Sequence, residues 1–343
     1  MAATLKIIAD KAGVSKSMVS MYLNSHPLSA HMAEKTKTRI RQAVDRFKYK
    51  PSYLARALSN KKTNVIGFIC GDIKSPFFAE KAAAMMKAAN EAGYRLQIMV
   101  TEWNFDKEFE CFDFLLEGSA DGIIFYNRGL PANSAYYKKI IEEKLPVVLI
   151  AGRIKNISCV SADLEPGFDQ AVGKLITSGH KRIVMAHDPE NIIKYKTYCK
   201  ICKKYKIRPE QIIYKDPYYT GKEPLISLGK KIAKDKYADA VIAAADYDAA
   251  LLMQGIREAG FKIPDDISMV GMDGIELGEY FYPPLSTIGQ PQNELAAAAV
   301  SELIKKINNP DAKSENLIIP SFFIDRKSIK PRSHHVQLEH PKQ

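Results

Sequence analysis

The sequence lacks any run of 18 or more apolar residues, so no segment is long enough to cross a membrane as a helix. Its start, MAATLKIIADKAG, has no hydrophobic stretch of signal-peptide length. We therefore expect a cytoplasmic protein with no membrane partner. At 343 residues the chain exceeds one ordinary domain, which predicts two or three.

Cysteine is scarce, and its pattern is uninformative for metal binding. The five cysteines are Cys70, Cys111, Cys159, Cys199 and Cys202. An odd, scattered set in a chain without an export signal is typical of free thiols. Cys199 and Cys202 form a C-x-x-C, but no second Cys or His pair lies at zinc-ligand spacing. We expect no metal, no cofactor, and two small residues on a Lys-rich helix.

Enzyme motifs are also missing. The sequence has no G-x-S-x-G, no G-x-x-x-x-G-K-[ST] and no G-x-G-x-x-G. We therefore predict no enzyme and no catalytic residues. The end of the chain, KPRSHHVQLEHPKQ, has no leucine heptads, so tetramerisation through a coiled coil is not supported and a homodimer is expected.

Acidic residues are rare near the start of the chain. Residues 1–62 hold 13 Lys and Arg against three acidic residues, a net charge of +10, whereas the whole chain carries +11. We call residues 1–62 the head and the rest of the chain the body. A basic head on a nearly neutral body predicts that the head binds a polyanion. A basic solvated arm is the alternative, and helical periodicity in the head argues against it.

The head shows the pattern of a helix-turn-helix. Thr4 is a good N-cap for a helix in which Leu5, Ile8, Ala9 and Ala12 recur at helical spacing, and Gly13 suits its end. A second N-cap candidate, Ser15, precedes an apolar stripe formed by Met18, Val19, Tyr22 and Leu23. Two short helices joined by a Gly-containing turn predict a DNA-binding motif, with an ordinary helical hairpin as the alternative.

The second helix would present Lys16, Ser17, Ser20 and Met21 near its N-terminal end, the part that enters the major groove in this motif. A Lys side chain can contact guanine or a phosphate, and a Ser hydroxyl can contact a base edge or a phosphate. A Met side chain can pack on a thymine methyl. A third helix should follow in AEKTKTRIRQAVDRFKY. The stretch Ser52–Ser59, after Pro51, is too short to be a stable helix alone.

From Val65 onward, short apolar runs alternate with helical stretches. The predicted strands are VIGFIC, RLQIMV, DGIIFY and PVVLI, and after about Asp163 a second series follows: RIVMAH, QIIY, DAVIAA and ISMVGM. Such alternation predicts parallel sheets with helices on both faces. Two similar series predict a two-lobed α/β body.

Several ordered motifs resemble the LacI/GalR family of bacterial transcription regulators over nearly the whole chain. They are AGVSKSMVSMYLN, FKYKPSYLARALSNKKTNVIGFI and DIKSPFF, then VSADLEPGFDQAVGKLITSGHKRI, FKIPDDISMVGMDG, PPLSTIGQP and DRKS. The resemblance implies an N-terminal all-α helix-turn-helix domain and a periplasmic-binding-protein-like body with two doubly wound parallel sheets. The chain would then cross between the lobes three times.

The resemblance implies these boundaries: 1–50 for the DNA-binding domain, 51–62 for a hinge helix and linker, and 63–343 for the body. Lobe 1 would hold about 63–161 and 290–320, and lobe 2 about 162–289 and 321–332. In the family the hinge helix lies in the minor groove, where a Leu wedges between base pairs; Leu58 stands there, beside Ala55. The expected DNA-binding residues are Thr4, Ser15, Lys16, Ser17, Ser20, Met21, Asn24, Tyr49, Ala55 and Leu58.

Ligands of open parallel sheets sit at the carboxyl ends of strands, so the cleft between two lobes is the expected small-molecule site. The residues we expect there are Asp72, Phe77, Tyr126, Tyr198, Asp246 and Asp273. Asp273 matches a family effector-contacting Asp, and Phe77 lies in a segment like the family's cleft lining. Asp246 is equally placed to be the N-cap of the helix that begins there.

The chain departs from the family pattern in head and cleft. Met21 replaces a frequent Arg, which implies an atypical operator. In the cleft, Ala151 stands where sugar-binding members have Asp, Tyr198 where a gapless alignment puts the effector-clamping Arg, and Ala245 where they have Asn. The loss of three polar anchors weakens a sugar ligand. A more aromatic or apolar ligand, a phosphorylated protein partner or no effector all remain open.

The leading hypothesis is a sequence-specific transcription regulator, most simply a repressor, that binds a palindromic double-stranded DNA operator as a homodimer. An effector in the cleft (a sugar, a sugar derivative or another small molecule) or a protein co-repressor would modulate it. A solute-binding protein of the same two-lobed fold is the alternative. An enzyme acting on a nucleoside or sugar is a third reading, and it lacks a catalytic constellation.

Overall fold

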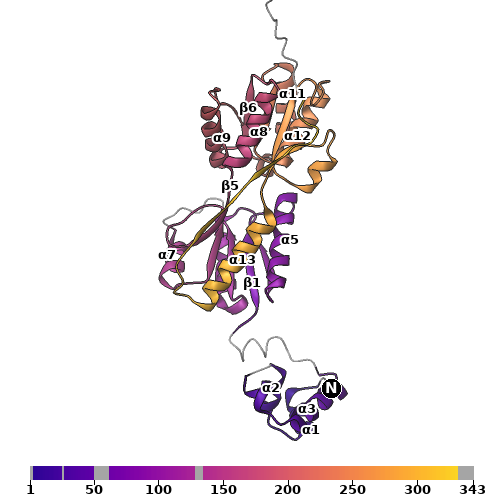
Figure 1. Cartoon of the computed structure of the whole chain (residues 1–343), viewed down its shortest axis with the longest axis vertical. Helices are drawn as coiled ribbons and strands as arrows, with labels where there is room; N and C mark the ends of the chain where they lie inside the picture. The colour runs from indigo at the N-terminus through magenta and orange to yellow at the C-terminus, as the bar shows by residue number, and fades with distance from the viewer. Residues whose placement is uncertain (1–2, 25–26, 50–61, 128–133, 331–343) are drawn as a thin grey trace, which may run out of the picture.

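The computed structural model describes residues 3–24, 27–49, 62–127 and 134–330. Figure 1 shows a small helical head and a larger body of two lobes, with the head beyond the end of lobe 1 that is farthest from lobe 2. The predicted short helix over Ser52–Ser59, with Ala55 and Leu58, lies outside the described residues.

The head contains two short helices joined by a tight turn, as predicted. Helix α1 (Leu5–Ala12) begins after Thr4, whose hydroxyl accepts a hydrogen bond from the Ile7 amide at 3.4 Å. It ends at Gly13, whose φ of 64° is the left-handed conformation that a glycine adopts without strain. Helix α2 (Lys16–Leu23) begins after Ser15, whose hydroxyl accepts from the Met18 amide at 3.2 Å.

A 3₁₀ turn η1 (Pro27–His31) and helix α3 (Glu34–Arg46) complete the described part of the head. The three helices close over a small core whose buried members are Ile8, Ala9, Ala12, Val19, Ile40 and Ala43. Of the predicted stripe on the second helix, Val19, Tyr22 and Leu23 contact this core, whereas Met18 is not part of it. The helix-turn-helix therefore has an apolar interior and a polar outer face.

Lobe 1 contains a six-stranded parallel sheet in the order β11-β5-β4-β3-β1-β2. Its strands are β1 (Val65–Cys70), β2 (Arg95–Val100), β3 (Gly122–Tyr126), β4 (Val147–Ile150), β5 (Ser158–Asp163) and β11 (Asn316–Pro320). One face packs against α5 (Pro76–Glu91) and α13 (Gln292–Asn308), the other against α6 (Phe105–Phe114) and α7 (Ala135–Glu142). A π-helical turn, η2 (Leu115–Ser119), follows α6.

Lobe 2 repeats this order as β12-β10-β9-β8-β6-β7, with only β12 antiparallel. Its strands are β6 (Ile183–His187), β7 (Glu210–Ile213), β8 (Ala240–Ala243), β9 (Ser268–Asp273), β10 (Ser286–Gly289) and β12 (Phe322–Ile324). Helices α8 (Glu165–Thr177) and α9 (Ile192–Lys204) cover one face, and α11 (Glu223–Lys234) and α12 (Asp246–Glu258) cover the other. The short elements are η3 (Pro189–Asn191), α10 (Pro217–Thr220) and η4 (Glu276–Tyr280).

The chain passes between the lobes three times: from β5 to α8, from β10 to α13, and from β11 to β12. Helix α13 therefore comes late in the sequence but packs on lobe 1, as predicted, and Figure 1 shows it beside β1 and α5. All eight strands predicted from the sequence are present. Four strands were not predicted: β5, β10, β11 and β12. The sequence of β5, SCVSAD, has three polar residues and lacks a continuous apolar run.

The described residues lack two kinds of feature. No helix among them is long and apolar enough to span a bilayer. No group of three or more His, Cys, Asp or Glu side chains among them could hold a metal ion. Cys199 and Cys202 are free thiols on α9, and Cys202 is buried in the core of lobe 2.

Candidate nucleic-acid interface and inter-lobe cavity

The outer face of α2 presents a short basic and polar surface. Lys16 and Ser17 are exposed at its first turn, and Ser20 and Met21 are half-buried one turn later. The helix contains no acidic residue. Because the N-terminus of a helix carries partial positive charge, Lys16 and the free amides of this turn form a site attractive to phosphate and to base acceptors.

The other predicted DNA-binding residues in the described head play local roles as well. Thr4 and Ser15 are exposed, and their hydroxyls cap α1 and α2. The side-chain amide of Asn24 donates to the Ser20 hydroxyl at 3.2 Å, which fixes both on one face of α2. Tyr49 is partly buried against the head core, so its ring has a packing function in addition to the DNA contact proposed for it.

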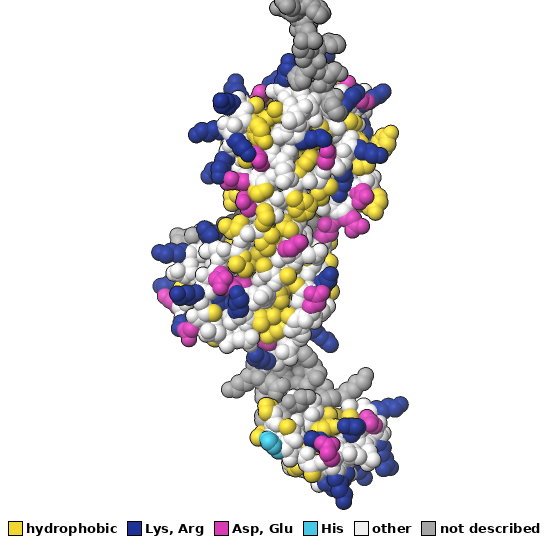
Figure 2. Space-filling view, viewed as in Figure 1, with side chains coloured by type: hydrophobic (Ala, Val, Ile, Leu, Met, Phe, Trp, Pro, Cys, Tyr) yellow, Lys and Arg dark blue, Asp and Glu magenta, His cyan; other side chains and the backbone are white. Residues whose placement is uncertain are grey.

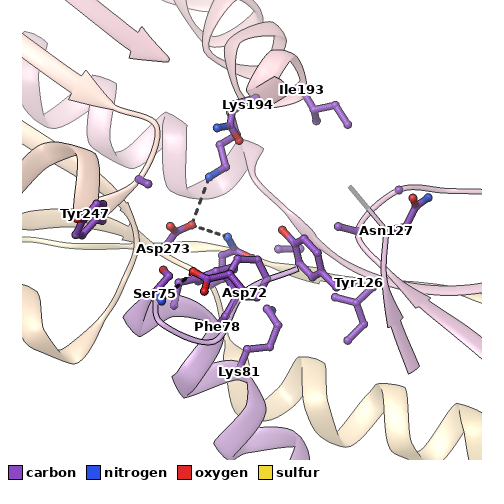
Figure 3. Close-up of a pocket in the computed structure, with 18 of the residues that line it drawn as sticks. Asp72, Ser75, Phe78, Lys81, Tyr126, Asn127, Ile193, Lys194, Tyr247 and Asp273 are labelled. Atoms are coloured by element: carbon purple, nitrogen blue, oxygen red, sulfur yellow. Dashed lines mark hydrogen bonds and ion pairs between the residues drawn. The ribbon is translucent and has the colours of Figure 1, made fainter. Parts of the chain in front are cut away.

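A cavity of about 690 Å³ lies between the two lobes, at the carboxyl ends of their strands. Four of the six predicted cleft residues line it: Asp72, Phe77, Tyr126 and Asp273. Asp72 follows β1, Tyr126 ends β3 and Asp273 ends β9, so the topology itself collects these side chains. Figure 3 shows Asp72, Tyr126 and Asp273 around the same space.

The lobe 1 wall of the cavity is a cluster of aromatic rings. Phe78 makes edge-to-face contacts with Tyr126 (centroids 4.9 Å apart) and Trp103 (5.3 Å), and Phe77 packs against Phe78 at 5.0 Å. Trp103 lies directly over Gly71, where a Cβ atom would come within 2.1 Å of the indole ring. Gly71 is thus required for the close approach that places Trp103 in the wall.

Beneath these rings lies a buried lysine, Lys81 on α5, that sequence reasoning did not single out. Its ammonium donates to the side-chain carbonyl of Gln292 at 2.7 Å and lies 4.8 Å from the centroid of the Phe77 ring. Burial lowers the pKa of Lys81 to about 8, because the charged form loses its hydration. The described structure provides no carboxylate in contact with this ammonium.

The lobe 2 wall is centred on an ion pair between Lys194 and Asp273, drawn as a dashed line in Figure 3. The Lys194 ammonium lies 3.4 Å from the Asp273 carboxylate and donates to the Ala244 carbonyl at 2.6 Å. Asp273 also accepts from the Gln290 amide at 3.1 Å. Burial is the largest single influence on the pKa of Lys194 and lowers it, but the charges of Asp273, Tyr126 and Asp248 together raise it more, and the net shift is upward.

Three further carboxylates, Asp188, Asp216 and Asp248, line the same wall. Asp248 is buried and accepts a hydrogen bond from the Tyr214 hydroxyl. Desolvation raises the pKa of Asp248 to about 7, although the bond from Tyr214 opposes the shift. This wall therefore presents oxygen acceptors to whatever enters the cavity.

Two of the predicted cleft residues do not line the cavity. Tyr198 is fully buried in the core of lobe 2, where its hydroxyl donates to the Ile183 carbonyl at 2.8 Å. Asp246 is buried behind the wall and accepts from the Thr287 hydroxyl at 2.6 Å and the Ile275 amide at 2.9 Å. It makes no N-cap bond to α12, so that alternative is wrong as well.

The residue that takes the place expected of Tyr198 is Lys194, one helical turn earlier on α9. The gapless alignment missed it because Lys194 and Tyr198 stand four residues apart and share one face of α9, so the sequence pattern does not separate them. Their positions along the helix differ: Tyr198 enters the core of lobe 2, whereas Lys194 stands in the first turn, shortly after the carboxyl end of β6.

Comparisons with known proteins agree with this architecture. A family model described as "Bacterial regulatory proteins, lacI family" matches residues 4–52, and one described as "Periplasmic binding protein-like domain" matches residues 172–329. The chain therefore carries a LacI-family helix-turn-helix domain in its head and a periplasmic-binding-protein-like domain in its body.

Two curated relatives match along almost their full length. Catabolite control protein A of Priestia megaterium is 28% identical over 342 residues, covering 95% of this chain and 99% of the relative. The transcriptional repressor PurR of Histophilus somni is 29% identical over 335 residues, covering 96% and 99%. The lac repressor dimer bound to operator and the anti-inducer ONPF has the same fold, with a TM-score of 0.84 at 22% identity, covering 96% of this chain and 100% of that one.

The structure also locates the two alanines that the sequence marks as departures from the family pattern. Ala151 and Ala245 both line the cavity, so neither position gives the wall a polar side chain. Arg153, two residues after Ala151, lines the cavity and gives the wall of lobe 1 a basic group.

Proposed function

We propose that this protein is a sequence-specific transcription regulator that binds a palindromic DNA operator as a homodimer and represses transcription. The observation that carries the proposal is the exposed, acid-free face of α2, headed by Lys16, on a capped helix-turn-helix. The curated relatives of nearly equal length are named as transcriptional regulators, which supports the same role and a cytoplasmic site of action.

A homodimer is supported by apolar side chains that the single chain leaves exposed. Leu277, Tyr280 and Tyr282, in and after η4, are 48%, 71% and 82% exposed. Figure 2 shows further hydrophobic side chains gathered over the junction of the lobes and along lobe 1. Exposed tyrosines on an ordered segment are characteristic of protein interfaces, where their rings become buried.

The effector would act by changing the relation between the two lobes. One hydrogen bond crosses between them beside the cavity: the Glu276 amide of lobe 2 donates to the Glu80 carboxylate of lobe 1 at 3.0 Å. Glu276 follows Asp273 by three residues, so a ligand that moves the Asp273 carboxylate also acts on this contact. Such a ligand would shift the population of DNA-competent arrangements by its differential affinity for them.

The test is selection of the purified protein on a random duplex pool at two salt concentrations. We expect enrichment of a palindrome with a flexible central pyrimidine–purine step. Lys16→Ala should weaken operator binding about tenfold and reduce the salt slope by about one if Lys16 contacts phosphate, or relax preference at one position if it contacts a base.

Lys6→Ala, on the exposed face of α1, is the matched control and should change binding less, because α1 is not the recognition helix. Salt-sensitive binding without any enriched sequence would contradict the proposal. A chain lacking residues 1–62 that still binds small molecules, combined with a full-length chain that selects no DNA, would favour the solute-binding alternative.

A further inference from the structure

The two walls of the inter-lobe cavity carry charges of opposite sign. Among the described lining residues, lobe 1 contributes three cations and one carboxylate, whereas lobe 2 contributes four carboxylates and one ammonium. The lobe 1 groups are Lys74, Lys81, Arg153 and Asp72; the lobe 2 groups are Asp188, Asp216, Asp248, Asp273 and Lys194. A ligand that fills this space therefore meets a basic wall on one side and an acidic wall on the other.

Most of the acidic groups already have partners in the protein. Asp72 accepts from the Lys74 and Ser75 amides at 2.8 and 3.0 Å, and Asp273 is paired with Lys194. The Asp216 carboxylate accepts from the Tyr218 amide at 2.8 Å. Each carboxylate retains lone pairs for a donor from the ligand. Neither Asp72 nor Asp273 forms an ion pair with a described cation of lobe 1, although the charge of Asp273 acts on Lys81 from a distance and raises its pKa.

The cations of lobe 1 differ from these carboxylates. Arg153 and Lys74 are exposed and line the cavity, and within the described residues neither side chain makes a hydrogen bond or ion pair. Lys81 is in a similar position, because its single side-chain acceptor is the neutral carbonyl of Gln292, whose own amide nitrogen is buried without an acceptor in the described structure. Closing the lobes over a neutral ligand would desolvate these cations without compensation, which is unfavourable.

We propose that the effector is an anionic polyol, with a phosphate or carboxylate group held by Arg153 and hydroxyl groups that donate to the lobe 2 carboxylates. This inference rests on the proposed role of the cavity as the effector site. A planar guanidinium binds either anion through two parallel hydrogen bonds. The ring cluster of Phe78, Trp103 and Tyr126 supplies an apolar surface for the carbon skeleton. The cavity of about 690 Å³ is of the size that binds small metabolites.

Trp103 provides the measurement, because it is the only tryptophan of the chain and lies in the cavity wall. We would titrate the full-length protein with ribose, ribose 5-phosphate, ribonate and inorganic phosphate and follow indole fluorescence. Ribose 5-phosphate or ribonate should bind at least about tenfold more tightly than ribose. Preference for the phosphate ester or for the sugar acid identifies the anionic group, and either preference supports the proposal.

Arg153→Gln should lower the affinity for the anionic sugar about tenfold and leave ribose unaffected. Lys155→Gln, two residues away, exposed and outside the cavity lining, should bind like the parent protein. The inference is overturned if ribose binds as tightly as its anionic derivatives, or if Arg153→Gln binds them unchanged. It is also overturned if none of the three anions at about 50 mM alters the fluorescence.

Operator selection by the Arg153→Gln variant separates this inference from the proposed function. The head is unchanged in that variant, so it should still select the same palindrome. In the parent protein, DNA selection without anion binding would overturn the ligand class alone, and absence of DNA selection would overturn the regulator role itself.

Discussion

The two lobes share a strand order but differ in how they hold charge. In lobe 2, the buried carboxylate of Asp273 is paired with a half-buried lysine, Lys194. In lobe 1, the buried carboxylate of Glu108 on α6 has one oxygen with no hydrogen-bond partner among the described residues, and the nearby Tyr137 hydroxyl is also unpartnered. The same architecture thus holds one buried carboxylate with a counter-charge, Asp273, next to the cavity and one without a counter-charge among the described residues, Glu108, away from it.

This difference shows that the doubly wound fold determines where side chains converge but not which chemical groups they carry. The strand ends of both lobes reach the cavity, yet one lobe supplies rings and cations and the other supplies carboxylates. Removing one partner of a buried charge or hydrogen bond in either lobe should change the free energy of unfolding by an amount that depends on what is left unpaired.

The largest effect is expected for Lys194→Met. Removing the ammonium leaves Asp273 buried without its counter-charge, so the protein should lose about 3 kcal/mol of stability in urea unfolding. The double variant Lys194→Met with Asp273→Asn should recover most of this loss, because the unpaired charge is gone. Lys200→Met, on the same helix, removes an exposed ion pair with Glu165 and should cost less than about 1 kcal/mol. Equal losses for the two lysines would show that the buried Asp273 does not depend on Lys194 for its counter-charge.

The opposite effect on stability, a gain, is expected for Glu108→Gln in lobe 1. Burial raises the pKa of Glu108 to about 7, so the folded state binds a proton that the unfolded state releases above about pH 4.5. Stability from this group is therefore complete at low pH and is lost as the pH rises toward 7. The variant should be about 2 kcal/mol more stable than the parent at pH 8 and gain less at pH 5. Glu110→Gln, exposed on the same helix, is the control; a gain of equal size at both pH values would argue against an ionised, unpaired Glu108.

A smaller effect is expected for Tyr214→Phe in lobe 2. The hydroxyl of Tyr214 donates to the buried Asp248, and its loss should cost about 1 kcal/mol. The same bond lowers the pKa of Asp248, so the variant should raise that pKa above its present value of about 7. The control is Tyr237→Phe, a ring packed on the same hydrophobic cluster. Matching melting temperatures for the two variants would show that Asp248 does not depend on this donor.

Much of this organisation could be predicted from the sequence because it rests on local patterns. The caps at Thr4 and Ser15, the left-handed Gly13 and the apolar strand runs all follow from short-range preferences. Asp72, Tyr126 and Asp273 could be placed in the cavity because each ends or follows a predicted strand. Strand ends are fixed by the fold, so residues tied to them are predictable.

The remaining features depend on tertiary contacts that local patterns do not encode. Lys81 reads as an exposed lysine in an alanine-rich helix, but α13, which comes more than two hundred residues later, provides the partner that buries it. Lys194 and Tyr198 differ by one helical turn, and only the packing of α9 decides which faces the cavity. The isolated charge of Glu108 could not be anticipated, because nothing in its surrounding sequence marks it as buried.

The three passages of the chain between the lobes have a consequence for synthesis on the ribosome. Residues 164–289 supply five of the six strands of lobe 2 in one continuous stretch, so most of that lobe can assemble as it emerges. Lobe 1 starts first but lacks α13 and the edge strand β11 until most of lobe 2 has been made. Until α13 is translated, the apolar face that it covers stays open to chaperones and proteases. The half of the body nearest the DNA-binding head is therefore begun first but closed late, so a chain truncated before α13 presents a formed helix-turn-helix on an unfinished lobe.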